Sequence, residues 1–279
     1  MTRVTVVVTS EWCRAPRLAR AAALTLATMV LVLALGPFLV SHGPTAMDLS
    51  NRLQAPSARH WFGTDELGRD LWSRVVHGGG ISLGMSLGVV ALGLGLGTLV
   101  GLWGGLVGGR IEAVLMRIVD VMLALPPLVL AMALAAAMGP GLGNAMLALV
   151  VVTVPTYVRL ARAQALQLRS RGYLEAAQLA GASLGYRLRV HVLPNAMGPL
   201  VVQGTLDVSG VMLASAALGF IGLGAQPPTP EWGSLIASGQ QFVKSAWWYP
   251  TLPGLAILLC ALSCNVLGDA LRDRLDPKG

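Results

Sequence analysis

Long apolar runs alternate with short polar segments along almost the whole chain. Six runs reach about 20 residues, the length at which a helix crosses a bilayer core of about 30 Å. They cover residues 19–40, 81–107, 118–138, 143–165, 197–224 and 247–268. The pattern predicts an all-α, polytopic membrane protein with six transmembrane helices. A soluble helical bundle is disfavoured because only 12% of the residues are charged, about half the usual share.

The basic residues are distributed by loop, which predicts an orientation. Six spans place both chain ends on one side, together with the connections at residues 1–18, 108–117, 166–196 and 269–279. Fifteen of the 20 Lys and Arg residues lie in or beside these segments. Since positively charged loops stay in the cytoplasm, both termini are predicted to be cytoplasmic. The net charge of +7 therefore reflects topology and not a nucleic-acid-binding face, and the first span is expected to be a retained anchor.

The outer loop, residues 41–80, is long and polar. We expect Thr64 to cap a short helix with Asp65 and Glu66 in its first turn, lying with an apolar face along the outer membrane surface. A metal site built from Asp65, Asp70, His60 and His77 is a possible alternative. Their irregular spacing favours ion pairs with the arginines at 69 and 74, and no metal ligand is assigned.

Three further features of the sequence predict packing and not chemistry. The pairs Gly84/Gly88 and Gly97/Gly101 have the small-residue spacing that lets membrane helices approach closely. The aromatic residues at 247–249 are interpreted as an interfacial belt at the start of the last span. The cysteines at positions 13, 260 and 264 form no CxxC pair and are interpreted as packing residues, not as a disulfide or a metal site.

Two polar residues are predicted to lie at bilayer depth. Asp207 is about ten residues into the fifth span, and Gln203 precedes it by one turn, so both project from the same side of the helix. A carboxylate costs at least about 2.5 kcal/mol at that depth, so Asp207 should face protein or a water-filled path. Asp207 and Gln203 are therefore candidates for a translocation path, and a helix–helix hydrogen bond is the alternative.

A polar segment, residues 166–196, interrupts the apolar runs on the cytoplasmic side. Ser170 is expected to cap a short helix that starts near Arg171 and ends at Gly181 in a left-handed turn. Small side chains at Ala176, Ala177 and Ala180 leave the helix surface open to another protein. A short, capped helix between two spans has the shape to enter a partner's cleft and to transmit its motion.

The same segment resembles a known sequence motif. The EAA motif of ABC-importer permeases is written as Glu-Ala-Ala, three residues, Gly, nine residues, Ile, any residue, Leu-Pro. This chain has Glu175, Ala176, Ala177, Gly181, Leu193 and Pro194 at those positions. It departs from the motif at His191, which stands at the Ile position.

Four other segments are similar to the C-type permease subunit of dipeptide, oligopeptide and nickel importers, with the dipeptide permease the most similar. They are GTDELGRDLWSR at 63–74, ALGFIGLG at 217–224, PPTPEWG at 227–233 and GDALRDRLDP at 268–277. The resemblance covers about residues 50–279 and implies a type I ABC importer permease fold in a bacterial inner membrane.

The resemblance also implies partners and a division of labour. They would be a homologous second permease, two cytosolic ATPases and an extracytoplasmic substrate-binding protein. The helix around Glu175, with Tyr173 at its start, would be the coupling helix that docks in an ATPase groove. The chain has no G-x-x-x-x-G-K-[ST] loop, so ATP and Mg²⁺ are expected in the ATPases; no cofactor and no catalytic residue are assigned here.

Other functions remain open at this point. Within the importer interpretation, the substrate could instead be nickel or a metal chelate, because the binding protein largely selects it. An ion-coupled secondary carrier is disfavoured because Asp207 is the one good deep carboxylate. A membrane-embedded enzyme is disfavoured because the chain has no HExxH motif and no paired deep carboxylates.

Overall fold

The computed structural model describes residues 17–40 and 42–275. Cys13, most of the N-terminal segment and residues 276–279 lie outside this part of the chain. The described part is all-α and contains no β-strand, which confirms the predicted fold class. Its helices are α1 (Arg17–Leu39), α2 (Leu71–Val107), α3 (Gly109–Leu123), α4 (Pro127–Met138), α5 (Leu142–Arg169), α6 (Gly172–Leu179), α7 (Leu184–Tyr186), α8 (Leu193–Phe220), α9 (Trp232–Gln240) and α10 (Trp248–Leu275), with a 3₁₀ turn η2 (Leu49–Asn51) and a π-helical segment η3 (Arg187–Val192).

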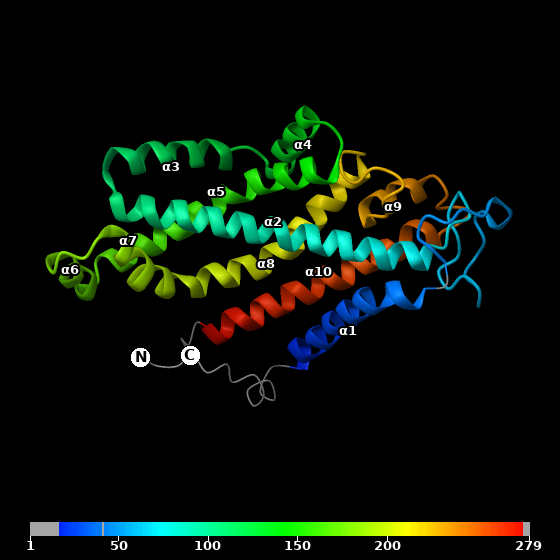
Figure 1. Cartoon of the computed structure of the whole chain (residues 1–279), viewed down its shortest axis with the longest axis horizontal. Helices are drawn as coiled ribbons and strands as arrows, with labels where there is room; N and C mark the ends of the chain where they lie inside the picture. The colour runs from blue at the N-terminus through cyan, green and yellow to red at the C-terminus, as the bar shows by residue number, and fades with distance from the viewer. Residues whose placement is uncertain (1–16, 41, 276–279) are drawn as a thin grey trace.

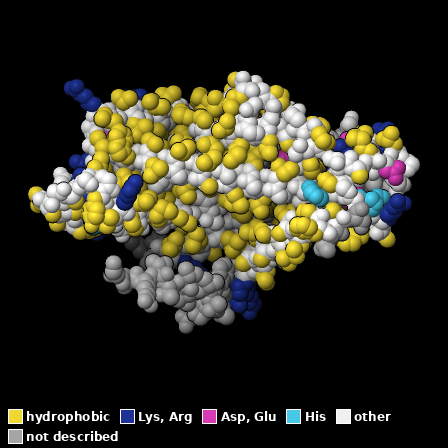
Figure 2. Space-filling view, in the orientation of Figure 1, with side chains coloured by type: hydrophobic (Ala, Val, Ile, Leu, Met, Phe, Trp, Pro, Cys, Tyr) yellow, Lys and Arg dark blue, Asp and Glu magenta, His cyan; other side chains and the backbone are white. Residues whose placement is uncertain are grey.

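The long helices α2, α5, α8 and α10 run along the long axis of the molecule (Figure 1). At one end, here called the loop end, lie residues 42–70 and the connection that contains α9. At the other end, here called the α6 end, the chain passes from α5 through α6 and α7 into α8. Figure 2 shows a largely hydrophobic flank, with the visible histidines toward the loop end. This is the distribution expected of a membrane-spanning bundle.

Five described helices are long and apolar enough to cross a membrane: α1, α2, α5, α10, and α8 together with the preceding segment from Leu184. The predicted third span, 118–138, differs from a simple helix. It consists of α3 and α4, which are bent by 93° relative to each other. Pro126 and Pro127 explain the break, since proline lacks an N–H and forces the residue before it out of helical geometry. Counted as one span, this pair is the sixth.

The predicted short helix capped by Thr64 is wrong. Residues 63–70 form turns, and the helix that follows is α2 itself, which Asp70 caps by accepting a bond from Ser73 N at 2.8 Å. Gly63 and Gly68 both have positive φ, at 73° and 72°, which no helix accommodates. The second predicted span therefore starts ten residues earlier than expected and has no separate surface helix before it.

Helices α2 and α5 pack through glycine. A Cβ atom at Gly97 would collide with Tyr157, one at Gly101 with the backbone of Val158, and one at Gly105 would come within 2.8 Å of the Ala165 methyl group. The predicted close approach at Gly97 and Gly101 is therefore confirmed and extends one turn further. Gly84, by contrast, faces open space.

The buried cysteines lie on the last helix. Cys260 and Cys264 are free thiols that pack into the main apolar core with Ile257 and residues of α8. This agrees with their interpretation as packing residues.

We predict that Gly101→Val lowers the stability of the bundle and Gly95→Val does not. The Cβ at position 101 meets backbone of α5, which has little freedom to move, whereas the one at position 95 meets nothing within 4 Å. Overpacking of this kind costs about 1 to 3 kcal/mol. Thermal unfolding of the purified variants in detergent measures the difference. Equal unfolding midpoints would contradict the glycine contact between α2 and α5.

Candidate functional site

At the α6 end, one buried side chain attaches α6 to the bundle. Leu174 is 3% exposed and packs into a cluster with Leu102 and Leu106 of α2, Ala161 and Ala165 of α5, and Ala196 and Leu200 of α8. All three long helices therefore meet beneath α6. A displacement of α6 would be transmitted to each of them.

The structure contradicts the prediction for the start of α6 and confirms the prediction for its end. Ser170 does not cap the helix: its hydroxyl donates to Gln167 O, and α6 begins after Arg171 without a side-chain cap. Gly181 does end it, with φ of 80° and bonds from Gly181 N to Gln178 O and from Ala182 N to Ala177 O. The left-handed end of the helix is thus confirmed.

The outer face of α6 is open. Tyr173, Glu175, Ala176 and Ala180 are exposed, and Ala177 is half-buried. Sequence reasoning missed a large apolar residue on this face, Leu179, which is 90% exposed. The sequence spacing could have predicted this exposure. Leu174 and Leu179 are five residues apart, so they point about 140° away from each other on a helix and cannot both face the core.

Side-chain contacts connect α6 to η3, the segment that leads into α8. The His191 ring lies 6.0 Å from Tyr173 and 5.6 Å from Tyr186, and Arg187 donates to Gln178 Oε1 at 2.6 Å. The imidazole at the position of the motif's Ile thus fills a space between two aromatic rings.

The predicted motif residues Leu193 and Pro194 stand in the first turn of α8. The π-helical segment η3 leads into this turn without a break, because Leu193 N bonds to Leu188 O. Such widened turns are rare and are common at functional sites. The connection from α6 to α8 is therefore helical from Leu184 onward.

In the middle of the bundle, Gln203 Nε2 donates to Asp207 Oδ1 at 2.9 Å, and both side chains are half-buried. This confirms that the two residues share one face of α8. Each also lines a cavity. Asp207 lines one of about 200 Å³, bordered by α3, α4, α5 and α8, and Gln203 lines one of about 420 Å³ between α5, α8 and α10. We call them the Asp207 cavity and the Gln203 cavity.

The two cavities lie along the same pair of helices. On α5, Leu149, Thr153 and Thr156 line the Asp207 cavity, and Leu160, Gln164 and Gln167 continue the row at helical spacing along the Gln203 cavity. On α8, the Asp207 cavity takes residues 207–214, toward the loop end, and the Gln203 cavity takes residues 199–206, toward the α6 end. The Gln203–Asp207 hydrogen bond lies at the boundary between the two cavities.

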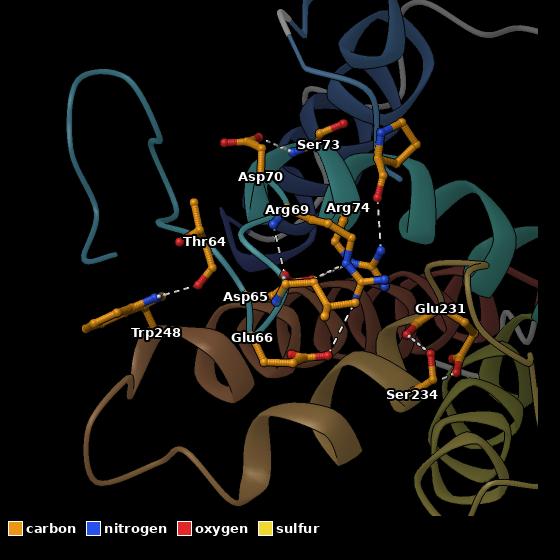
Figure 3. Close-up of polar contacts among 12 residues, drawn as sticks. Thr64, Asp65, Glu66, Arg69, Asp70, Ser73, Arg74, Glu231, Ser234 and Trp248 are labelled. Atoms are coloured by element: carbon orange, nitrogen blue, oxygen red, sulfur yellow. Dashed lines mark hydrogen bonds and ion pairs between the residues drawn. The ribbon is translucent and has the colours of Figure 1, made fainter. Parts of the chain in front are cut away.

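The loop end is closed by a buried ionic network (Figure 3). Asp65 is fully buried, accepts from Arg69 Nε at 2.6 Å and from two backbone N–H groups, and lies 3.4 Å from Arg74 Nε. Arg74 donates to Pro44 O at 2.9 Å and Glu66 pairs with Arg69 at 3.3 Å. The predicted ion pairs of this loop with Arg69 and Arg74 are therefore confirmed.

Beside this network lies a group that the sequence reasoning did not assemble. His60 Nδ1 is 2.9 Å from Asp70 Oδ1, and His42 brings a third ligand atom, so that all three lie within 4.8 Å of one another. Of the four residues considered as metal ligands in the sequence analysis, His60 and Asp70 lie in contact. His77 is instead hydrogen-bonded to Ser73 O, and Asp65 is paired with the arginines. Both Asp70 oxygens are already engaged, by His60 and by Ser73 N.

The connection that contains α9 is locked to α2. Glu231 is 1% exposed and caps α9 by accepting from Gly233 N and Ser234 N, and Ser82 of α2 donates to it at 3.2 Å. Burial raises the pKa of the Glu231 carboxyl above its ordinary value, although these hydrogen bonds lower it. Trp232 Nε1 donates to Val75 O at 2.9 Å, so α9 cannot separate from α2 without breaking buried polar contacts.

The predicted aromatic belt at the start of α10 is wrong for two of its three members. Trp247 is 56% exposed, but Trp248 is 7% and Tyr249 0% exposed. Trp248 Nε1 donates to Thr64 O at 3.5 Å, which places the ring beneath the loop (Figure 3). These two rings seal the loop end instead of facing the membrane interface.

Comparison with known proteins gives one family and close relatives. Residues 93–278 match the family described as binding-protein-dependent transport system inner membrane component. The chain is 51% identical over 256 residues to the probable D,D-dipeptide transport system permease protein of Escherichia coli strain K12, covering 92% of this chain and 86% of the relative. It is 50% identical over 226 residues to the di/tripeptide transport system permease protein of Pseudomonas aeruginosa strain UCBPP-PA14, covering 81% and 75%. It is also 48% identical over 222 residues to the dipeptide transport system permease protein of the same E. coli strain, covering 80% and 74%.

We predict that Asp65→Asn strongly destabilises the loop end. Removing the shared partner of two buried arginines leaves Arg74 without its carboxylate and Arg69 with Glu66 alone, at a cost of about 3 to 5 kcal/mol. The matched change Glu66→Gln, at a side chain 23% exposed, should cost less than about 1 kcal/mol. Limited proteolysis of residues 42–70 in the two variants measures the effect. Similar cleavage rates would show that the network does not hold the loop.

Proposed function

Because the chain belongs to the family of binding-protein-dependent transport system inner membrane components, we propose that it is the permease subunit of an ATP-driven importer for dipeptides or similar short peptides. Three relatives with 48 to 51% identity carry dipeptide or di/tripeptide transport in their names. These names favour peptides over nickel or a metal chelate. Which peptide is carried is left to the substrate-binding protein.

The observation that carries the ATP-driven part of the proposal is the geometry of α6. This helix presents Leu179 and an alanine-rich face to solvent and is anchored by Leu174 where α2, α5 and α8 meet. An exposed leucine beside small side chains suits a groove on another protein. We place that groove on a cytosolic ATPase, which would supply ATP and Mg²⁺, since this chain has no phosphate-binding loop of the usual kind.

The remaining partners follow from the same proposal. A homologous second permease would complete the translocation path, a second ATPase would serve it, and an extracytoplasmic binding protein would deliver the peptide. The α6 end would be cytoplasmic, because the basic loops gather there, and the loop end would face the binding protein.

The contacts suggest how movement would pass through the chain. When the ATPases close on ATP, α6 would shift with its groove. Leu174 passes the shift to α5 and α8, and the contacts of His191 and Arg187 tie α6 to η3, which leads into α8. The loop end, held by buried ion pairs, would act as the fixed part. Because the Gln203–Asp207 pair stands between the two cavities on α8, we assign these residues to the translocation path.

An ion-coupled secondary carrier is the second candidate. It would use Asp207 as a proton or cation site. The exposed α6 face has no role in such a carrier.

The experiment is copurification of the tagged chain from its native membrane. We expect a second permease and P-loop ATPases to accompany the wild-type chain. Leu179→Asp should reduce the recovered ATPase about 10-fold or more while the second permease stays bound, since position 179 touches no part of the core. Gly181→Asp should act in the same direction by straining the left-handed turn that ends α6.

The matched control is Ser170→Asp, which adds the same charge at an exposed position just before α6. It should leave ATPase recovery close to that of the wild-type chain. Recovery of the chain alone, or equal ATPase recovery with Leu179→Asp, would refute the coupling role of α6.

A further inference from the structure

Among the described residues that line the two cavities, Asp207 is the one acidic side chain. The cavity that it lines is otherwise apolar except for Thr153 and Thr156, and it has no basic side chain. Among the described residues, the ion pairs of the chain do not include Asp207. Within residues 17–40 and 42–275, the carboxylate therefore faces the cavity without a basic side chain paired to it.

The groups around Asp207 orient it without neutralising it. Gln203 donates one hydrogen bond to Oδ1, and the buried Tyr157 hydroxyl is close enough to interact with the carboxylate electrostatically. A carboxylate has room for about four hydrogen bonds. The negative charge in an apolar setting costs at least about 2.5 kcal/mol, and an arriving cation would offset that cost.

We propose that Asp207 binds the N-terminal ammonium group of a peptide as it passes through the permease. This inference rests on the proposed function and names the part of the substrate that this site recognises. An ammonium group has three N–H donors, and the cavity offers three oxygen acceptors on two side chains: the two carboxylate oxygens of Asp207 and the hydroxyl of Thr156. The Thr153 hydroxyl is engaged elsewhere, because it donates to Val150 O and lies against Gly93 of α2.

A peptide ammonium fits this site better than a metal ion does. Hard cations take six or more oxygen ligands, several of them carboxylates, and this cavity has one carboxylate among methyl and methylene groups. The side chain of the first peptide residue, by contrast, can pack on Leu149 or Val211 while the ammonium stays on Asp207.

The neighbouring cavity suits the rest of the peptide. The Gln203 cavity is lined by Gln164, Gln167 and Arg272, which can bond to peptide amides and to a carboxylate. Because Gln203 touches both sites, a peptide released from Asp207 moves directly into a polar region nearer the α6 end. Import from the loop end would follow this order.

The test uses the full transporter, with both permeases, the ATPases and the binding protein, reconstituted in lipid vesicles. ATP-driven uptake of labelled Ala-Ala is measured per ATP hydrolysed. Asp207→Asn keeps the size of the side chain and an oxygen for Gln203 but removes the charge. We expect it to lower uptake about 10-fold to 100-fold, the value of a charged hydrogen bond, with stimulated ATP hydrolysis within about 2-fold of wild type. Asp207→Glu should restore most of the uptake.

A second measurement locates the peptide end. A dipeptide with a photoreactive diazirine on its first side chain should crosslink to residues 149–156 and 207–214 during turnover, and the crosslink should fall about 10-fold in Asp207→Asn. The matched control is Asp120→Asn, which removes a carboxylate paired with Arg159 outside both cavities. It should leave both measurements near those of the wild type.

The outcomes separate this inference from the proposed function. Full uptake with Asp207→Asn, or uptake lost with Asp207→Glu but kept with Asp207→Asn, would show that the charge is not used. Crosslinks confined to other helices, or loss of the second permease from the Asp207→Asn complex, would also overturn the ammonium site. If the wild-type transporter needs a proton gradient and no ATP, the proposed function itself fails.

Discussion

The close contact between α2 and α5 is the constraint on which the rest of the structure depends. Glycines at 97, 101 and 105 bring the two backbones together, and no larger side chain fits there without displacing α5. One side of α5 packs against α2, and the adjoining row of its residues, from Leu149 to Gln167, lines the two cavities. The path that we propose for the peptide is therefore the face of α5 that glycine packing leaves free.

The two ends of the bundle are held by different kinds of interaction. Buried ion pairs and hydrogen bonds close the loop end, where Asp65 pairs with nearby arginines and where Glu231 and Trp248 connect segments far apart in the sequence. Small apolar contacts around Leu174 close the α6 end. Buried charge pairs need fixed geometry, whereas alkyl side chains tolerate sliding, so movement is easier at the α6 end. This difference between the two ends suits the proposed transporter, in which ATPases bound at the α6 end drive the movement.

The sites assigned to coupling and to the peptide lie on one continuous element. From Leu184 the chain is helical through η3 into α8, and Asp207 stands about four turns beyond Leu193 on that helix. A shift of α6 can therefore alter the position of the Gln203–Asp207 pair without a separate relay. The same helix ends at the loop end, where Gly219 lies against the buried Glu231 carboxylate.

The sequence by itself determined the membrane-spanning class, the unequal distribution of basic loops, the left-handed end of α6 at Gly181 and the shared face of Gln203 and Asp207. These depend on composition and on helical periodicity, which are local properties. Two further features could have been predicted from the sequence. Pro126–Pro127 indicates the bend between α3 and α4, and the spacing of Leu174 and Leu179 indicates that one of these leucines is exposed. Only the tertiary structure decided that Trp248 and Tyr249 are buried, that His42 lies beside His60, and that the face of Asp207 borders a cavity. Burial and cavities depend on which helices pack together, and that is settled by contacts between residues distant in the sequence, such as Gly101 with Val158.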